Sequence, residues 1–274
     1  MKAAIALCIA ASLWVPAMPA ASPAALEGIA HVALRVSDLG KSREFYKALG
    51  FEESFMFADP GKAPVSYMKV NDTQFIELYG RVQESQPLGL MHICYEAADI
   101  NALYDEYVRR GLEVRAPTKA RAGNMLFSIH DPEGQLLEYT MYLPGSLHSE
   151  DRGKHLGEHR VASRLIGAAM AVRDVAAERE FFVAKLGFRD AGVDGSIQRL
   201  RLPGTSGAEI EMEPAAGATK ARVVFAVADL GQTLQDLQGR GVTAAKKGGA
   251  VLATDPDGAA LEFRAVPGAP AAGH

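Results

Sequence analysis

The chain has 274 residues, which is enough for two ordinary domains, and 48% of them are hydrophobic while 23% are charged. This composition is typical of a soluble globular protein. The formal net charge of −4 at pH 7 excludes the broad basic field of a nucleic-acid-binding protein, so we expect no nucleic acid among its partners.

Residues 1–21 have the pattern of a Sec signal peptide. Lys2 precedes the apolar run "AAIALCIAASLWV", and the small residues "AMPAASPA" then offer a cleavage site after Ala20 or Ala21. The run is short for a membrane span. We therefore expect an exported protein, periplasmic or extracellular, with no stable membrane insertion after cleavage. Cleavage leaves Cys94 as the one cysteine, which excludes an intrachain disulfide.

Four segments share one pattern of strand, aspartate, amphipathic stretch and glycine. They are "HVALRVSDLGKSREFYKALGF" from His31, "HICYEAADINALYDEYVRRGLEV" from His92, "GAAMAVRDVAAEREFFVAKLGF" from Gly167 and "RVVFAVADLGQTLQDLQGRGV" from Arg222. The gaps from aspartate to glycine are 12, 12, 13 and 12 residues. Such a gap fits a helix of about three turns that begins at an aspartate cap and ends at a left-handed glycine.

Each repeat ends on a further strand that carries a glutamate. These strands are "FIELYG" with Glu77, "LLEYTMY" with Glu138, "EIEMEP" with Glu211 and "ALEFRAV" with Glu262. The turns "DPEG" (131–134) and "DPDG" (255–258) precede the second and the fourth, and their Pro and Gly suit a type I turn with a bulge. Each unit therefore has the order β-α-β-β-β, which predicts an α+β fold of four modules.

The segment 144–163 separates the second repeat from the third. It is polar, rich in Gly and His, and without periodicity, so we interpret it as an interdomain linker. Its histidines, His148, His155 and His159, could bind a metal or cover a site, and we expect them in a solvated loop. The tail 267–274 is expected to be disordered.

Two histidines and two glutamates occupy equivalent positions in the first two repeats. His31 and His92 each lie seven residues before the capping aspartate of their repeat, and Glu77 and Glu138 each lie 39 residues after it. Such positions converge if the two modules face each other. Two imidazoles and two carboxylates suit one divalent ion, such as Ni, Zn, Co, Mn or Fe, with positions left for water or substrate.

The whole pattern resembles the vicinal oxygen chelate superfamily, which contains glyoxalase I, the bleomycin resistance proteins and the extradiol dioxygenases. The resemblance covers about 28–266. It implies two consecutive domains, 27–143 with the metal site and 164–266 without a complete metal set, each a curled mixed sheet that forms a cup with helices outside. It also implies the metal ligands, which are His31, Glu77, His92 and Glu138, the His/Glu/His/Glu set of bacterial-type glyoxalase I.

The third and fourth repeats depart from this set. Gly167 and Arg222 stand where the first two repeats have histidine, while Glu211 and Glu262 remain. Two acids without imidazoles are a poor metal site. We therefore hypothesise that the Arg222 guanidinium lies between the two carboxylates as a permanent cation.

The resemblance implies an enzyme with a small-molecule substrate, and a second copy of the chain is a further candidate partner. In glyoxalase-like relatives the last-strand glutamate acts as the base, which here is Glu138, with Glu77 as the candidate that returns the proton. The expected chemistry is proton transfer alpha to a carbonyl, by isomerisation, epimerisation or a lyase reaction. One alternative is an Fe(II) extradiol ring-cleaving dioxygenase that uses His31, His92 and Glu138. Another is a non-catalytic binding or resistance protein.

Cys94 lies two residues after His92 and therefore on the same face of its strand. It could approach the metal, but we expect a packed core thiol.

Overall fold

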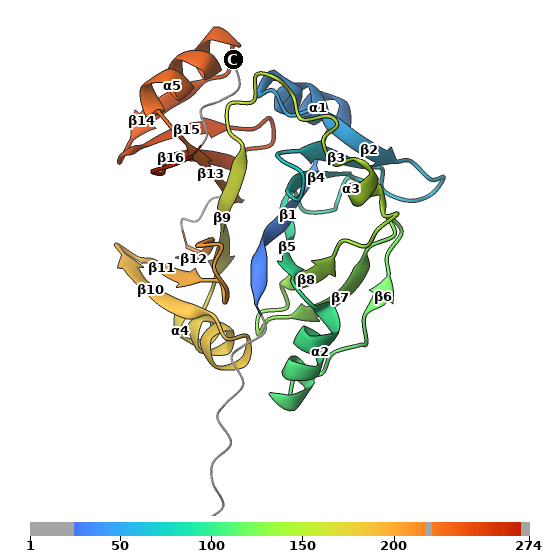
Figure 1. Cartoon of the computed structure of the whole chain (residues 1–274). Coiled ribbons are helices and arrows are strands. Elements are labelled where there is room, and N and C mark those ends of the chain that lie inside the picture. Colours follow the sequence, from blue (N-terminus) through green and yellow to red (C-terminus); the bar gives the residue numbers. More distant parts are fainter. Residues whose placement is uncertain (1–24, 217–220, 270–274) are drawn as a thin grey trace, which may run out of the picture.

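The computed structural model describes residues 25–216 and 221–269. The predicted signal peptide, residues 1–21, lies outside the described residues, as do residues 270–274 of the predicted tail. Within the described ranges, no helix combines the length and the apolar character that a membrane span requires. The chain forms two eight-stranded sheets, which lie side by side in Figure 1 with helices at their outer ends.

The first sheet has the strand order β2-β3-β4-β1-β5-β8-β7-β6. Its strands are β1 (Leu26–Val36), β2 (Glu53–Phe57), β3 (Val65–Lys69), β4 (Phe75–Gly80), β5 (Gly89–Ala97), β6 (Thr118–Lys119), β7 (Met125–His130) and β8 (Leu136–Met141). Helix α1 (Leu39–Ala48) follows β1, and helix α2 (Ile100–Arg109) follows β5. The short helix α3 (Leu147–Glu150) comes after the last strand.

The second sheet repeats this order as β10-β11-β12-β9-β13-β16-β15-β14. Its strands are β9 (Arg164–Val172), β10 (Arg189–Asp194), β11 (Ile197–Arg201), β12 (Glu209–Pro214), β13 (Arg222–Val227), β14 (Ala244–Lys247), β15 (Ala250–Thr254) and β16 (Ala260–Ala265). Helix α4 (Val175–Glu180) continues as the π-helical turn η1 (Phe181–Lys185), and α5 (Leu230–Gly239) follows β13.

The predicted fold class is confirmed, because each sheet contains two β-α-β-β-β modules that are consecutive in the chain. In the first sheet, the leading strands β1 and β5 pair antiparallel at the centre, and each also pairs in parallel with the last strand of its own module. The same pairings recur around β9 and β13. The first strands and the last strands of two modules therefore form the middle of each curled sheet.

The four long helices begin and end at the predicted residues. Each capping carboxylate accepts a hydrogen bond from a backbone N–H of the first turn, and the caps are Asp38, Asp99, Asp174 and Asp229. The glycines that follow have φ between 76° and 83°, and they are Gly50, Gly111, Gly187 and Gly241. The third repeat has one residue more between cap and glycine, and the π-helical turn η1 accommodates it.

Alternation along the strands gives each sheet one apolar face and one face that lines a cup. On β4, Ile76 and Leu78 are fully buried in the main core, while Phe75 belongs to a separate aromatic cluster inside the cup. The apolar faces of both sheets contribute to one continuous core, in which Phe51 stacks on Phe225 with ring centroids 5.5 Å apart. The two halves are therefore packed together over an apolar contact.

The segment between the second and third modules is bound to the first sheet. The Lys69 side chain of β3 is completely buried and donates to the Asp151 carboxylate at 2.9 Å and to the Lys154 carbonyl at 2.7 Å. The expectation of a solvated loop is wrong for His148, which is 3% exposed, whereas His155 and His159 are exposed. The error arose because tertiary packing on β3 and β4 places α3 inside the cup.

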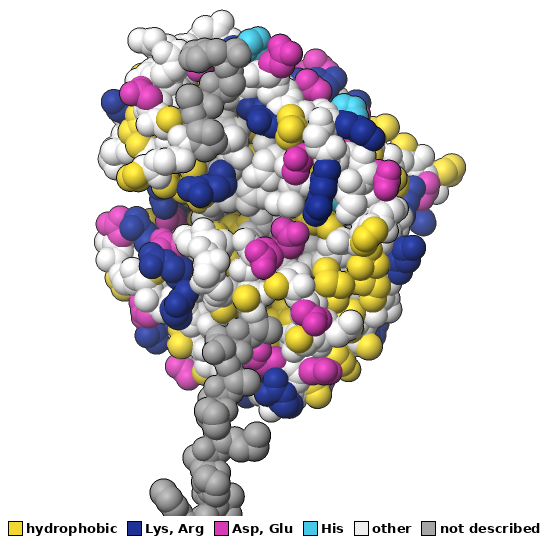
Figure 2. Space-filling view, in the orientation of Figure 1, with side chains coloured by type: hydrophobic (Ala, Val, Ile, Leu, Met, Phe, Trp, Pro, Cys, Tyr) yellow, Lys and Arg dark blue, Asp and Glu magenta, His cyan; other side chains and the backbone are white. Residues whose placement is uncertain are grey.

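Charged side chains of both signs are interspersed on the surface. Figure 2 shows Lys and Arg interspersed with Asp and Glu over one face of the molecule, without a field of a single sign, and a group of apolar side chains on the right of the view. This distribution agrees with the small net charge of −4.

Candidate metal centre

Four side chains from equivalent positions of the first two modules meet inside the first cup. They form the His/Glu cluster, which consists of His31, Glu77, His92 and Glu138. Strand register brings them together, because Glu77 on β4 and His92 on β5 both pair with Ala33 of β1. These three residues form one row across neighbouring strands. In a second row, His31 and Glu138 both pair with Cys94 of β5. The middle of each row is a small residue, which leaves room for the four side chains to converge.

The ligand atoms of the His/Glu cluster are separated by distances that suit a shared ion. The Nε2 atoms of His31 and His92 are 3.1 Å apart. Glu77 Oε2 lies 3.5 and 3.4 Å from them, and Glu138 Oε2 lies 3.8 and 3.4 Å from them. Ligands at roughly 2.1 Å from one ion, with angles of 90–110°, are roughly 3.0–3.5 Å apart. Every separation except the 3.8 Å between His31 and Glu138 falls in this range, so His31, Glu77 and His92 fit a divalent metal ion, and Glu138 stands slightly farther away.

Burial strengthens this interpretation. His31, Glu77 and His92 are all 5% exposed or less. Glu77 Oε2 and His31 Nδ1 are buried without a hydrogen-bond partner among the described residues. A buried carboxylate requires a compensating positive charge, and the two facing imidazole nitrogens require a proton or a cation between them. One divalent ion satisfies both requirements.

The pKa values of Glu77 and His92 show how a proton can compensate the buried negative charge of the cluster. Burial acts to raise the pKa of Glu77, but the imidazoles of His31 and His92 outweigh it and lower the pKa to about 2. Burial acts to lower the pKa of His92, but the nearby carboxylates of Glu77, at 3.4 Å, and Glu138 raise it. A proton on His92 therefore serves the same electrostatic purpose as a bound cation.

The two carboxylates have different surroundings. Glu77 is flanked by Tyr67 and Tyr79, and burial together with this carboxylate raises the pKa of both phenols. The side chain of Glu77 is 4% exposed, whereas that of Glu138 is 16% exposed and is the most open of the cluster. Glu77 is therefore held in place, and Glu138 is the carboxylate with more freedom to move.

Cys94 is a buried free thiol, as expected, but it also lies beside the cluster. Its sulfur and one ligand atom each of His31 and Glu138 lie within 4.8 Å of one another, as do the ligand atoms of His31, Glu77 and His92. Burial raises the pKa of the thiol well above its usual value, and Glu138 adds to this effect. A neutral thiol therefore faces the space between the ligands.

A cavity of about 370 Å³ opens above the His/Glu cluster. His31, Glu77 and Glu138 are part of its lining, together with apolar and aromatic side chains of β2 and β3 and two cationic side chains, Lys62 and Arg121. The Arg121 guanidinium lies 3.8 Å above the Phe57 ring. The cavity therefore combines candidate metal ligands, an apolar wall and positive charge.

Sequence reasoning did not find two of the lining residues, Tyr67 and Arg121, and it placed a third, His148, in a solvated loop. Tyr67 pairs with Glu77 across β3 and β4, so its place on the cup face follows from the register, which the sequence did not give. Arg121 comes from a loop without a pattern, and His148 comes from the segment interpreted as a linker. Burial and the neighbouring His31 lower the pKa of His148 to about 3.

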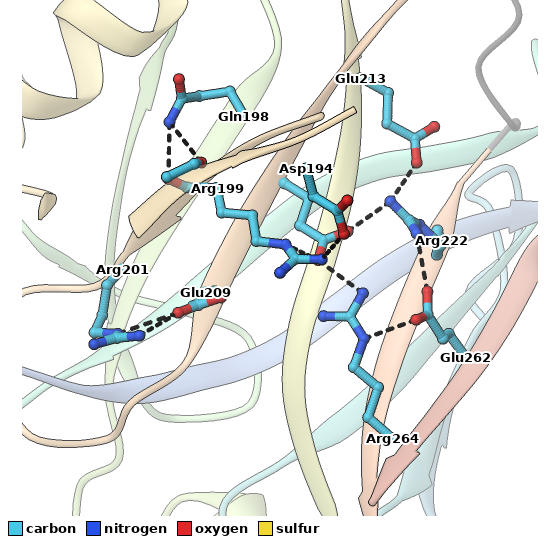
Figure 3. A network of polar contacts seen from close by, with 11 residues as sticks. Asp194, Gln198, Arg199, Arg201, Glu209, Glu213, Arg222, Glu262 and Arg264 are labelled. Carbon is cyan, nitrogen blue, oxygen red and sulfur yellow. Dashed lines mark hydrogen bonds and ion pairs between the residues drawn. The ribbon is translucent and has the colours of Figure 1, made fainter. Parts of the chain in front are cut away.

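The second cup contains ion pairs where the first has the His/Glu cluster (Figure 3). The Arg222 guanidinium donates to Glu262 at 2.9 Å and to Glu211 at 2.5 Å, and it also contacts Glu213. Arg264 bonds to the same two carboxylates at 2.7 Å for Glu262 and 2.8 Å for Glu211. The hypothesis that Arg222 lies between Glu211 and Glu262 is confirmed.

Fold and site together define a protein built from two cups of paired β-α-β-β-β modules, with a candidate divalent-metal centre in the first cup. A family model described as the glyoxalase/bleomycin resistance protein/dioxygenase superfamily matches residues 28–139. The match to this superfamily therefore lies in the first domain. A comparison with curated proteins found no match.

Solved structures with the same fold include the Mn(II)-bound glyoxalase from Novosphingobium aromaticivorans, with a TM-score of 0.67 and 15% identity over 91% of this chain and 85% of that one. An extradiol ring-cleaving dioxygenase from B. fuscum has a TM-score of 0.65 and 17% identity over 92% and 77% of the two chains. The 2,3-dioxygenase LapB from Pseudomonas sp. KL28 has a TM-score of 0.66 and 15% identity over 90% and 95%.

Proposed function

We propose that the first domain is a divalent-metal-dependent enzyme of the glyoxalase type, which transfers a proton alpha to a carbonyl of a small oxygen-chelating substrate. The observation that carries this proposal is the convergence of both carboxylates on both imidazoles, with every N–O distance at 3.8 Å or less. The metal is Ni, Zn, Co, Mn or Fe, held by His31, Glu77, His92 and Glu138. When bound, it supplies a Lewis acid that polarises the substrate carbonyl.

The protein's own residues then move the proton. Glu138, the more open carboxylate, removes a proton from the carbon next to the carbonyl and becomes a carboxylic acid. Glu138 then returns this proton to the same or the neighbouring carbon and becomes a carboxylate again. Glu77, the other candidate for this role, can donate only after it has taken up a proton, because the neighbouring imidazoles lower its pKa to about 2. Tyr67 and Tyr79 hold Glu77 in place, and the apolar wall of the cavity limits access of water.

An extradiol ring-cleaving dioxygenase is the second candidate. His31, His92 and Glu138 form a two-histidine, one-carboxylate set with separations of 3.1, 3.4 and 3.8 Å. Such a set is typical of non-haem Fe(II) oxygenases, which keep open positions on the iron. The fold neighbours that are 2,3-dioxygenases support this candidate at the level of architecture alone.

One experiment separates these functions from a non-catalytic binder. The purified protein is loaded with each of the five metals and incubated in D₂O with small α-hydroxyketones and hemithioacetals, and exchange of the carbon-bound proton is followed by NMR. We expect exchange in wild type and its loss in Glu138→Gln. Oxygen uptake with catechols by the Fe(II) form, without proton exchange, would support the dioxygenase instead. Tight ligand binding with neither reaction would support a binding protein.

Export is a second proposal, and it is supported by residues 1–21 alone. The basic, apolar and small-residue pattern is that of a signal peptide. Expression of the full chain in a bacterial host, followed by N-terminal sequencing of the periplasmic fraction, tests it. A new N-terminus at Ala21 or Ser22 is expected, and an intact N-terminus in the cytosolic fraction would contradict export.

A further inference from the structure

Helix α3 places a histidine inside the first cup. Ser146 caps the helix by accepting a hydrogen bond from the Ser149 backbone N–H, and His148 follows in the first turn with 3% of its surface exposed. The helix belongs to the segment between the two domains rather than to a β-α-β-β-β module. His148 therefore has no counterpart in the repeat pattern.

Aromatic rings surround the His148 imidazole. Tyr142 stacks on it with ring centroids 4.5 Å apart and an interplanar angle of 27°. Phe55, Phe75 and Tyr67 make edge contacts with centroids at 5.0, 5.1 and 5.6 Å. These contacts fix the plane of the imidazole ring without occupying its two nitrogens.

Neither ring nitrogen of His148 has a hydrogen-bond partner among the described residues. Burying a polar group without a partner costs free energy, and phenylalanine would fill the same aromatic site without this cost. The ring also lines the cavity that contains His31, Glu77 and Glu138. A small molecule in this cavity can therefore supply the missing partner.

We propose that His148 is a ligand-binding residue of the first cup, whose imidazole donates a hydrogen bond to an oxygen atom of the bound molecule. This inference rests on the proposed function, in which two other oxygens of the same molecule face the His/Glu cluster. The ligand class is a small oxygen-rich compound with a flat apolar body, which packs against Phe57 and Tyr67. Lys62 and Arg121 in the same lining share the Asp59 carboxylate, so they keep one excess positive charge, which favours an anionic group on the ligand.

The connection of α3 to the sheet keeps the imidazole in position. The buried Lys69 ammonium bonds to the Asp151 carboxylate, one residue beyond the end of α3, and pairs with Asp72 at 3.0 Å. Tyr67 lies two residues before Lys69 on the same strand and contacts the His148 ring. The strand that lines the cavity thus also holds the helix that carries the histidine, which is the kind of support a binding residue requires.

The test measures metal and ligand separately in wild type, His148→Phe and His148→Gln, with His130→Phe as the control at an exposed position. Metal content is determined first, and binding of mandelate, a small α-hydroxycarboxylate with a flat ring, is then measured by calorimetry. We expect His148→Phe to retain the metal, to melt at the same or a higher temperature, and to bind mandelate about 10-fold or more weakly. His148→Gln, which keeps an N–H donor, should recover part of the affinity.

Equal mandelate affinity in wild type and His148→Phe would overturn the inference, and so would a metal-loaded wild type that binds no mandelate. A lower melting temperature of His148→Phe with unchanged affinity would show a structural role and would also overturn it. If wild type holds no metal, the proposed function fails. In that case the role of His148 is tested by comparing mandelate binding to the metal-free forms of wild type, His148→Phe and His148→Gln.

Discussion

Arg222 occupies in the second sheet the register position that His92 occupies in the first. His92 pairs with Ala33 of β1, and Arg222 pairs with Ala169, the corresponding residue of β9. Glu77 and Glu211 pair with the same two alanines from the other side. The same backbone position therefore carries an imidazole that can bind a cation in the first cup. In the second cup it carries a guanidinium, which is itself a permanent cation.

The second set of paired strand residues in the second cup has also lost its histidine. Gly167 pairs with Val224, which in turn pairs with Glu262, where the first cup has His31, Cys94 and Glu138. A Cβ atom on Gly167 would lie 3.0 Å from the Glu209 carbonyl oxygen. The second cup therefore lacks both imidazoles and keeps both acids, and arginines take over the compensation of their charge.

Replacement of a metal ligand should abolish metal retention. We expect His92→Ala to bind a divalent ion more than about 100-fold more weakly than wild type, because changes even in the supporting shell cost about 10–100-fold. Metal content after gel filtration and calorimetric titration measure this effect. His130→Ala removes an exposed imidazole and should leave both quantities unchanged. Full retention in His92→Ala would contradict the proposed site.

Metal affinity should fall as the pH is lowered. Since Glu77 and Glu138 raise the pKa of His92, the metal-free protein holds a proton there up to a higher pH than a free histidine does. A metal ion must displace this proton, so binding weakens below the raised pKa and releases a proton. Calorimetry in buffers of different ionisation enthalpy counts the released protons. An affinity that is constant from about pH 5 to 8 would exclude this coupling.

Removal of the central arginine should destabilise the second half. Arg222→Ala removes one of the cations of Glu211, whose side chain is 1% exposed, and should cost about 1–3 kcal/mol of unfolding free energy, because Arg264 still pairs with this carboxylate. Arg201→Ala breaks an exposed pair and should cost less than about 1 kcal/mol. Urea unfolding measures both. Arg222→Met combined with Glu211→Gln should be more stable than Arg222→Ala, and a less stable double variant would contradict the charge argument.

The buried Lys69 should determine how firmly the segment that carries α3 is attached to the first sheet. Lys69→Met removes the bonds to Asp151 and Lys154 and should cost about 1–3 kcal/mol, because the Asp151 carboxylate, which has low exposure, then keeps only His155 as a charged partner. Limited proteolysis should then cut the segment 144–163 faster than in wild type. Lys41→Met, at an exposed ion pair, is the matched control. Unchanged cleavage rates in Lys69→Met would show that the apolar contacts of α3 suffice.

Glu178 should make stability depend on pH. Burial and the neighbouring Asp131 raise its pKa from 4.5 to about 7. The folded protein thus disfavours the charged form, so this residue reduces stability progressively as pH rises from about 4.5 to 7. Glu178→Gln should match wild type at pH 4 and be about 1–2 kcal/mol more stable at pH 8. Thermal unfolding at both pH values tests this, with the exposed Glu180→Gln as control.

Local features were predictable because their causes lie within a few residues. The aspartate caps and the glycines with positive φ follow from backbone hydrogen bonding and from the steric freedom of glycine. The position of Arg222 between two acids could also be predicted, since it follows from the repeat alignment. The 13-residue gap of the third repeat could be read from the sequence, but not its accommodation in the π-helical turn η1, which continues a helix, α4, that packs against β11 and β12.

The sequence by itself determined the four modules, the face of each strand and the equivalence of the two imidazoles and two carboxylates, because alternation and repetition along the chain encode them. Only the tertiary structure decided which other groups surround them. The stacking of His148 on Tyr142, the place of Cys94 between His31 and Glu138, and the burial of Lys69 arise from contacts between distant segments. Such contacts depend on how the sheet curls and on where the connecting segment packs, and these follow from the summed burial of many side chains.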